Sequence, residues 1–133
     1  MNLQAFMLPE DELNKEVVKV ISKRYKEAFR FKAITPKRDA EIKNKCVKYK
    51  TGAKGRQEAQ FDPTSYQHAL IMECLVYPDL NNQQLQDHYK VMGAENLFDK
   101  MFNANEVAEM FIAVQEVNGY DQTFEELVEE AKN

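Results

Sequence analysis

The apolar and polar residues of the first third of the chain follow a strand-like pattern. Val17-Val18-Lys19-Val20-Ile21 is short and rich in β-branched residues, and Phe29-Arg30-Phe31-Lys32 alternates apolar with basic side chains. Both patterns are typical of half-buried strands. We therefore expect an antiparallel β-hairpin within residues 15–35. Its connection should be irregular, because residues 22–28 contain no two-residue turn signal such as Asn-Gly.

The next pattern predicts a helix over residues 36–51. Thr35 is a good N-cap, and Pro36 fits the first helical position, where its missing N–H costs nothing. The expected apolar face of this helix consists of Ile42, Cys46 and Tyr49. Residues 52–60 hold two glycines and several charges, so we expect a flexible basic loop there.

Helical spacing dominates the rest of the chain, residues 61–133. Asp62-Pro63 repeats the Thr-Pro start signal and opens a strongly apolar helix that Pro78 should end. A short helix is expected over residues 83–89, and another after Gly93 carries a buried stripe. The expected stripe consists of Leu97, Phe98, Met101 and Phe102.

The clearest helix signal begins at Asn103. Asn103 and Glu106 form a capping pair, and the amphipathic helix that follows should end at Gly119. Phe111 lies at the centre of its apolar face, and we expect this side chain to be part of the core. A last helix is expected from Thr123, with Glu126 as the capping partner. The apolar face of the helix after Asn103 consists of Val107, Met110, Phe111, Val114 and Val117.

These elements predict an α+β fold that is mainly α, in which an N-terminal β-hairpin of two short strands precedes a compact bundle of about five to six helices. The 133 residues suffice for one domain with its own core, so we expect a single domain over 1–133. Neither a signal peptide nor about 18 consecutive apolar residues occurs, so we expect a soluble protein without a membrane span. Cys46 and Cys74 show no metal-ligand or disulfide-framework spacing, which favours a reducing cytoplasm.

Charge is unevenly distributed along the chain. Residues 15–56 hold 15 of the 18 Lys and Arg residues but only four acidic residues, although the whole chain has a net charge of -4. One interpretation is a solvated helix face; the other is a partner-binding or polyanion-binding patch in which Tyr49 stacks between cations. Overall acidity weighs against nucleic acid as the partner. The candidate partner-binding residues are Lys43, Lys45, Lys48, Tyr49, Lys50, Lys54 and Arg56.

Residues for catalysis or metal binding are sparse. His68 and His88 are the only histidines, and they lie on different predicted helices. No zinc-protease motif, nucleophile elbow or glycine-rich phosphate loop is present. We therefore expect no catalytic residues, no metal and no cofactor, with a small enzyme of unrecognised type as a remaining alternative.

Several stretches, in the same order along the chain, resemble the XkdN-like phage tail assembly chaperones. The N-terminal stretches are Leu3-Gln4-Ala5-Phe6-Met7, Val20-Ile21-Ser22-Lys23-Arg24-Tyr25 and Phe31-Lys32-Ala33-Ile34-Thr35. The central stretches are Tyr66-Gln67-His68-Ala69-Leu70-Ile71, Tyr77-Pro78-Asp79-Leu80 and Leu85-Gln86-Asp87. The C-terminal stretches are Ala104-Asn105-Glu106-Val107-Ala108-Glu109-Met110, Val117-Asn118-Gly119-Tyr120 and Glu130-Ala131-Lys132-Asn133.

The resemblance implies a non-catalytic protein of a phage or prophage that acts in the bacterial host cytoplasm. Such a chaperone binds the tape measure protein, keeps it soluble and helps the tail tube protein assemble around it. This role needs binding surfaces rather than an active site. The basic residues after Thr51 match no feature of the family pattern. The alternative function is therefore a small nucleic-acid-binding accessory protein that uses residues 43–56.

Overall fold

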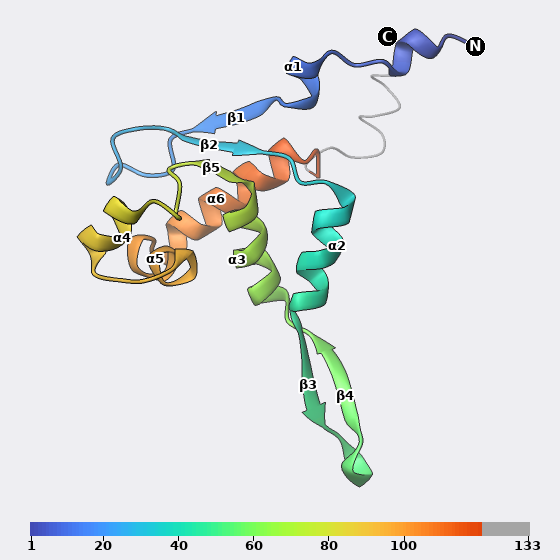
Figure 1. The fold of residues 1–133 in the computed structure, drawn as a ribbon, viewed down its shortest axis with the longest axis vertical. Coiled ribbons are helices and arrows are strands. Elements are labelled where there is room, and N and C mark those ends of the chain that lie inside the picture. The colour runs from blue at the N-terminus through green and yellow to red at the C-terminus, as the bar shows by residue number, and fades with distance from the viewer. Residues whose placement is uncertain (121–133) are drawn as a thin grey trace.

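The computed structural model describes residues 1–120 of the chain. Within them, six α-helices and five β-strands form an α+β fold that is mainly helical (Figure 1). An N-terminal hairpin precedes the helical part, so the expected fold class is confirmed. The helix predicted from Thr123 lies outside the described residues.

A three-stranded antiparallel sheet contains the predicted hairpin. Strand β1 (Glu16–Lys19) pairs with β2 (Phe29–Lys32), and Val17 lies opposite the fully buried Phe31. The third strand, β5 (Leu75–Tyr77), pairs with the other edge of β2. We expected these residues to end a helix at Pro78; instead the helix ends at Cys74, because the extended backbone of β5 completes the sheet.

The helices lie on one face of this sheet (Figure 1). The central helix α6 (Ala104–Val117) packs against β1 and β2, and α3 (Pro63–Cys74) packs against α6. The predicted capping box of α6 is present. The remaining helices of the body are α2 (Pro36–Lys45), α4 (Gln83–Tyr89) and α5 (Ala94–Met101).

One hydrophobic core joins the sheet to these helices. Met110 and Val114 of α6 are fully buried. Phe111, which we expected in the core, is only partly buried and packs against its edge. Met110, one residue earlier on the helix, is completely buried instead, because consecutive side chains of a helix project in directions about 100° apart. The other fully buried apolar side chains include Phe31, Leu70, Ile71, Leu97 and Ala113.

The segment between α2 and α3 differs most from the sequence prediction. The helix expected over residues 36–51 stops at Lys45, and Val47–Thr51 forms strand β3. The expected loop over residues 52–60 contains a 3₁₀ turn, Ala53–Gly55, and most of strand β4, Gln57–Phe61. The two strands form an antiparallel hairpin that projects from the body (Figure 1). Val47, Tyr49 and Thr51 are β-branched or aromatic at every second position, and this period of two prevails over the helical spacing.

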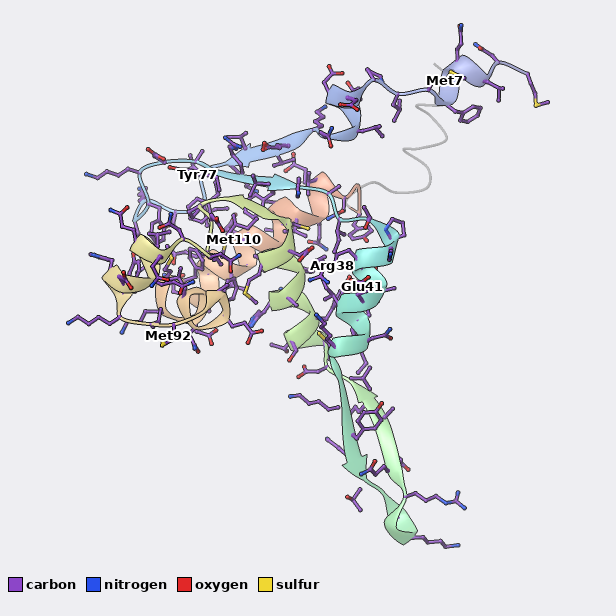
Figure 2. All side chains as sticks on the ribbon, in the orientation of Figure 1. Met7, Arg38, Glu41, Tyr77, Met92 and Met110 are labelled. Atoms are coloured by element: carbon purple, nitrogen blue, oxygen red, sulfur yellow. The ribbon has the colours of Figure 1, made fainter. Side chains whose placement is uncertain are left out.

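A second projection is formed by the first fourteen residues. A 3₁₀ turn (Leu3–Phe6) and the one-turn helix α1 (Glu10–Leu13) precede β1, and neither contains a buried residue. This N-terminal arm runs away from β1 beyond the sheet, and the arm and the β3–β4 hairpin project from opposite ends of the body (Figure 1). Met7 lies on the arm, far from the core residue Met110 (Figure 2).

Candidate partner-binding surface

The β3–β4 hairpin places most of the predicted binding residues on a two-stranded ribbon. Its register pairs Val47 with Phe61 at the base and Thr51 with Gln57 at the tip. The turn reverses the chain with positive φ angles at Lys54 (62°) and Gly55 (74°). Glycine adopts this conformation without the steric cost that a Cβ atom brings, so Gly55 suits the position.

Strand alternation divides the ribbon into two chemically different faces. One face is apolar to weakly polar, and the other is charged. Tyr49 and Phe61 on the first face are 69% and 44% exposed, so within the described chain this face is uncovered beyond its base. The first face consists of Val47, Tyr49, Thr51, Gln57, Ala59 and Phe61, and the second of Lys48, Lys50, Glu58 and Gln60.

Asp62 fixes the base of the hairpin to the start of α3. Its carboxylate caps the helix by accepting hydrogen bonds from the backbone N–H groups of Thr64 (3.1 Å) and Ser65 (3.3 Å). The same carboxylate lies 2.7 Å from Lys48 Nζ. This ion pair raises the pKa of Lys48 and, with the Ser65 hydrogen bonds, lowers the pKa of Asp62. The ring of Phe61 also lies 5.7 Å from that of Tyr66, centroid to centroid. These contacts attach the base of the hairpin to α3, whereas the side chains of the ribbon beyond the base are exposed.

The structure separates the predicted binding residues into three groups. Lys43 lies on α2, and its Nζ is paired with the Asp39 carboxylate at 2.9 Å, which raises the pKa of Lys43. Lys45 ends α2 beside the hairpin base. Tyr49 lies on the opposite face of the ribbon from its neighbours, so it does not share a surface with Lys48 and Lys50. The remaining two residues, Lys54 and Arg56, lie at the tip.

Sequence reasoning did not find the apolar face, because residues 52–60 were interpreted as a loop. The signal that could have found it is the alternation Val-Lys-Tyr-Lys-Thr, followed after the two glycines by a second extended stretch that ends in Phe61. A Gly-containing connection between two alternating runs is typical of a hairpin.

An open groove of about 550 Å³ lies beside the hairpin base, between α2, α3 and α5. Arg38 and Glu73 line this groove. Arg38 donates hydrogen bonds to both carboxylate oxygens of Glu73 at 2.8 and 3.2 Å and to Glu41 at 2.9 Å. The hydrogen bonds that Arg38 donates to these two carboxylates raise the pKa of Arg38. Each charge in this network has a partner, so we interpret the network as a structural link between α2 and α3 rather than as a charged ligand site.

Residues suited to metal or thiol chemistry do not cluster in the described part of the chain. Residues 1–120 contain no group of three or more His, Cys, Asp or Glu side chains placed to hold a metal ion. Cys46 and Cys74 are buried free thiols, and burial raises the pKa of Cys74 to about 11. Among the same residues, no helix is both long and apolar enough to span a bilayer.

Comparison with known proteins places the chain in a family. The sequence profile described as "Phage XkdN-like tail assembly chaperone protein" matches residues 3–132. The protein YqbN of Bacillus subtilis (strain 168) is 32% identical over 138 residues, covering 97% of this chain and 92% of that protein. The phage-like element PBSX protein XkdN of the same organism is 28% identical, covering 97% and 93%.

A comparison of folds leads to one of the same relatives. The crystal structure of YqbN superposes on this chain with a TM-score of 0.66 at 25% identity, covering 91% of this chain and 98% of that one. The family match spans nearly the whole sequence and includes the apolar helices that build the core. This chain belongs to the XkdN-like family of phage tail assembly chaperones.

Proposed function

We propose that the protein binds the tape measure protein of a phage tail in the host cytoplasm and assists the assembly of the tail tube protein around it, without catalysing a reaction. Membership of the tail assembly chaperone family supports this role. A chaperone of this kind needs a surface that holds an apolar client and releases it, and the β3–β4 hairpin has the properties of such a surface.

The observation that carries the proposal is the exposed apolar face of the hairpin. An isolated two-stranded ribbon is marginally stable in water, so packing against another surface would stabilise it. Tyr49 offers a large, rigid contact at low entropic cost, which makes it the best anchor on the ribbon. The unpaired outer edges of β3 and β4 provide backbone N–H and C=O groups to which an extended client segment can add as a further strand.

The basic residues at the tip and on the opposite face of the ribbon select the charge of the client. Within residues 1–120, no ion pair joins Lys50, Lys54 or Arg56 to an acidic residue, so their charges are available to a partner. Such exposed charges accelerate association with an acidic segment more than they tighten the complex. The proposed binding residues are Lys43, Lys45, Lys48, Tyr49, Lys50, Lys54 and Arg56, with Val47 and Phe61 at the base of the apolar face.

A binding experiment with the tape measure protein of the same phage tests the function. The wild-type chain should co-purify with it and keep it in the supernatant after centrifugation. A variant in which residues 48–60 are replaced by Asn-Gly should lose both effects, because it lacks the ribbon that carries Tyr49. A two-residue turn can join the paired residues Val47 and Phe61, and the variant keeps the Asp62 cap of α3 although it loses the Lys48–Asp62 ion pair. Failure of the wild-type chain to bind or solubilise the tape measure protein would refute the proposal.

Two neighbouring substitutions identify the face that binds. Tyr49→Ser removes the anchor from the apolar face, whereas Lys50→Ser removes a charge from the opposite face. We expect Tyr49→Ser to weaken tape measure binding by roughly 10- to 100-fold and Lys50→Ser by less than about fivefold, mainly in the association rate. Equal affinities for the two variants would show that the hairpin does not bind through its apolar face.

The second candidate function is nucleic-acid binding, which the exposed basic tip favours, because a two-stranded ribbon fits the major groove of duplex DNA. Two of the predicted cations, Lys43 and Lys48, are already neutralised by Asp39 and Asp62, which reduces the number of phosphates the hairpin can contact. Binding of a mixed-sequence DNA duplex that weakens steeply with salt and is lost on Lys54→Gln/Arg56→Gln would support this second function.

A further inference from the structure

The N-terminal arm exposes more apolar surface than water favours. Phe6 is 83% exposed, and no residue of the arm is buried. Its hydrogen bonds are local, from the Asn2 cap to the turns of α1. An exposed run of this kind marks a contact with another surface rather than a free end. The exposed apolar residues of the arm are Met1, Leu3, Phe6, Met7, Leu8 and Leu13.

A second uncovered apolar surface lies on the outer face of the three-stranded sheet. The helices cover only the inner face (Figure 1). Val18 and Val20 point outward and are 63% and 64% exposed. Beside them, Arg30 is paired with Glu16 at 3.2 Å and lies 5.9 Å from the ring centroid of Tyr77. This outer face therefore combines two aliphatic side chains, an aromatic ring and the Arg30–Glu16 ion pair.

The two surfaces have opposite charges. The arm, residues 1–14, carries Glu10, Asp11 and Glu12 and no Lys or Arg. The segment that forms β1, β2 and their connection, residues 15–32, carries seven basic and two acidic side chains. Arg24 and Arg30 of this segment are paired with Glu106 and Glu16. The arm is therefore acidic, whereas the segment keeps a basic border of five lysines that no ion pair holds within residues 1–120: Lys15, Lys19, Lys23, Lys26 and Lys32. Such complementarity orients one surface on the other and disfavours contact between two arms.

The arm does not reach the outer face of its own sheet. Only Asn14 and Lys15 separate the end of α1 from the start of β1. The arm continues away from the sheet at that point (Figure 1). In this conformation no residue of the arm packs against the core that the sheet shares with the helices. A second copy of the chain, facing the first, can receive the arm with its backbone unchanged.

We propose that two copies of this chain associate by exchanging N-terminal arms, each arm covering the outer sheet face of the other copy. The apolar residues of the arm lie on Val18, Val20 and Tyr77, and its acidic residues lie near the basic border. A twofold arrangement makes both contacts at once, because the same two surfaces meet twice. The β3–β4 hairpins stay free at the far ends, so the inference is independent of the proposed client binding.

Sedimentation velocity on the full chain tests the exchange. The wild-type protein should be a dimer across the micromolar range. Val18→Asp places a negative charge on the receiving face, and Leu3→Ser/Phe6→Ser/Leu8→Ser removes the apolar part of the arm. Each variant should weaken dimerisation by roughly 10- to 100-fold while its far-UV circular dichroism spectrum stays that of the wild type, because none of these residues is buried. Met92→Ser, which changes an 84% exposed residue outside both surfaces, should leave the dimer intact.

Mixing the two variants supplies the decisive measurement. The Val18→Asp chain keeps an intact arm, and the triple-serine chain keeps an intact receiving face. One of the two contacts can therefore form between them, so the mixture should dimerise more tightly than either variant alone. A monomeric wild-type protein, a dimer that both variants leave unchanged, or a mixture no tighter than its components would each overturn the proposal.

Discussion

Arg24 holds the carboxylate of Glu106 at the start of helix α6. Glu106 is 1% exposed, and it accepts hydrogen bonds from Arg24 Nε at 2.9 Å, from Arg24 Nη2, from Ser22 Oγ at 2.6 Å and from the backbone N–H of Asn103 at 2.9 Å. Arg24 Nη2 also donates to the Met101 carbonyl at 2.8 Å. One buried carboxylate thus joins the connection between β1 and β2 to the junction of α5 and α6.

Loss of Arg24 should destabilise the fold more than loss of the Glu106 charge. Arg24→Met leaves a buried charge without its cation and should cost about 2–4 kcal/mol, whereas Glu106→Gln keeps an acceptor for Asn103 and should cost about 1–2 kcal/mol. The double variant should cost less than the sum of the two, because neither charge is left alone. Urea denaturation of the three variants measures this coupling.

A matched control for this pair is Arg30→Met. The partner of Arg30, Glu16, lies at the surface of the sheet, so the loss should stay below about 1 kcal/mol. Additive effects of Arg24→Met and Glu106→Gln would show that the two side chains do not stabilise the fold as a pair.

Low pH should lower the free energy of unfolding by protonating the Glu106 carboxylate. The hydrogen bond from Arg24, which outweighs the opposing effect of burial, lowers the pKa of Glu106 from 4.5 to about 2. A depressed pKa in the folded state stabilises the fold above the unfolded pKa, and this contribution is lost as the pH falls from about 4.5 toward 2. The wild-type chain should lose roughly 2–3 kcal/mol more than Glu106→Gln over that range. Parallel pH profiles of unfolding for the two proteins would contradict this assignment.

Local signals in the sequence predict much of this fold. The Asn103 and Glu106 pair predicts the start of α6, and the Asp62-Pro63 and Thr35-Pro36 signals predict the starts of α3 and α2. These devices act within one helical turn, so they are visible in the residues themselves. The partner of Glu106 is not visible in this way, because Arg24 lies 82 positions earlier and only the tertiary fold brings the two together.

The C-terminal ends of α2 and α3 depend on strand pairing with residues far along the chain, which explains why both helices were predicted to be too long. Cys46 and Tyr49 fit the helical spacing from Ile42, yet Val47–Thr51 gains a partner strand that the single-segment pattern does not reveal. Leu75–Tyr77 likewise leaves α3 to pair with β2. The geometry predicted for the candidate surface was therefore wrong, and its apolar face became apparent only from the register. The binding role of its residues stays a prediction.

The core of α6 provides a test that separates burial from position on the helix. Met110 is fully buried, and Ile112, two residues later, is 47% exposed. Met110→Ala should cost about 2–5 kcal/mol, because it leaves a cavity between α6, the sheet and α3. Ile112→Ala should cost less, about 1 kcal/mol, since about half of this side chain is already in contact with water. Similar losses in thermal unfolding of the two variants would mean that Ile112 is buried in solution, for instance by self-association.

The β3–β4 hairpin should behave as a separable, weakly protected unit. Its side chains beyond the base are exposed, and the contacts of Phe61 with Tyr66 and of Asp62 with α3 lie at the base. Replacement of residues 48–60 by Asn-Gly should therefore change the free energy of unfolding by less than about 1 kcal/mol, because the lost Lys48–Asp62 ion pair is solvent-exposed on the lysine side.

Hydrogen exchange adds a second readout for the same unit. Backbone amides of β3 and β4 should exchange much faster than those of α6, since ribbon hydrogen bonds open without unfolding the body. Addition of the tape measure protein should slow exchange in β3 and β4 and leave α6 unchanged. Protection of the free hairpin equal to that of α6, or a large loss of stability in the replacement variant, would show that the hairpin is an integral part of the domain rather than a ribbon that gains its order from a partner.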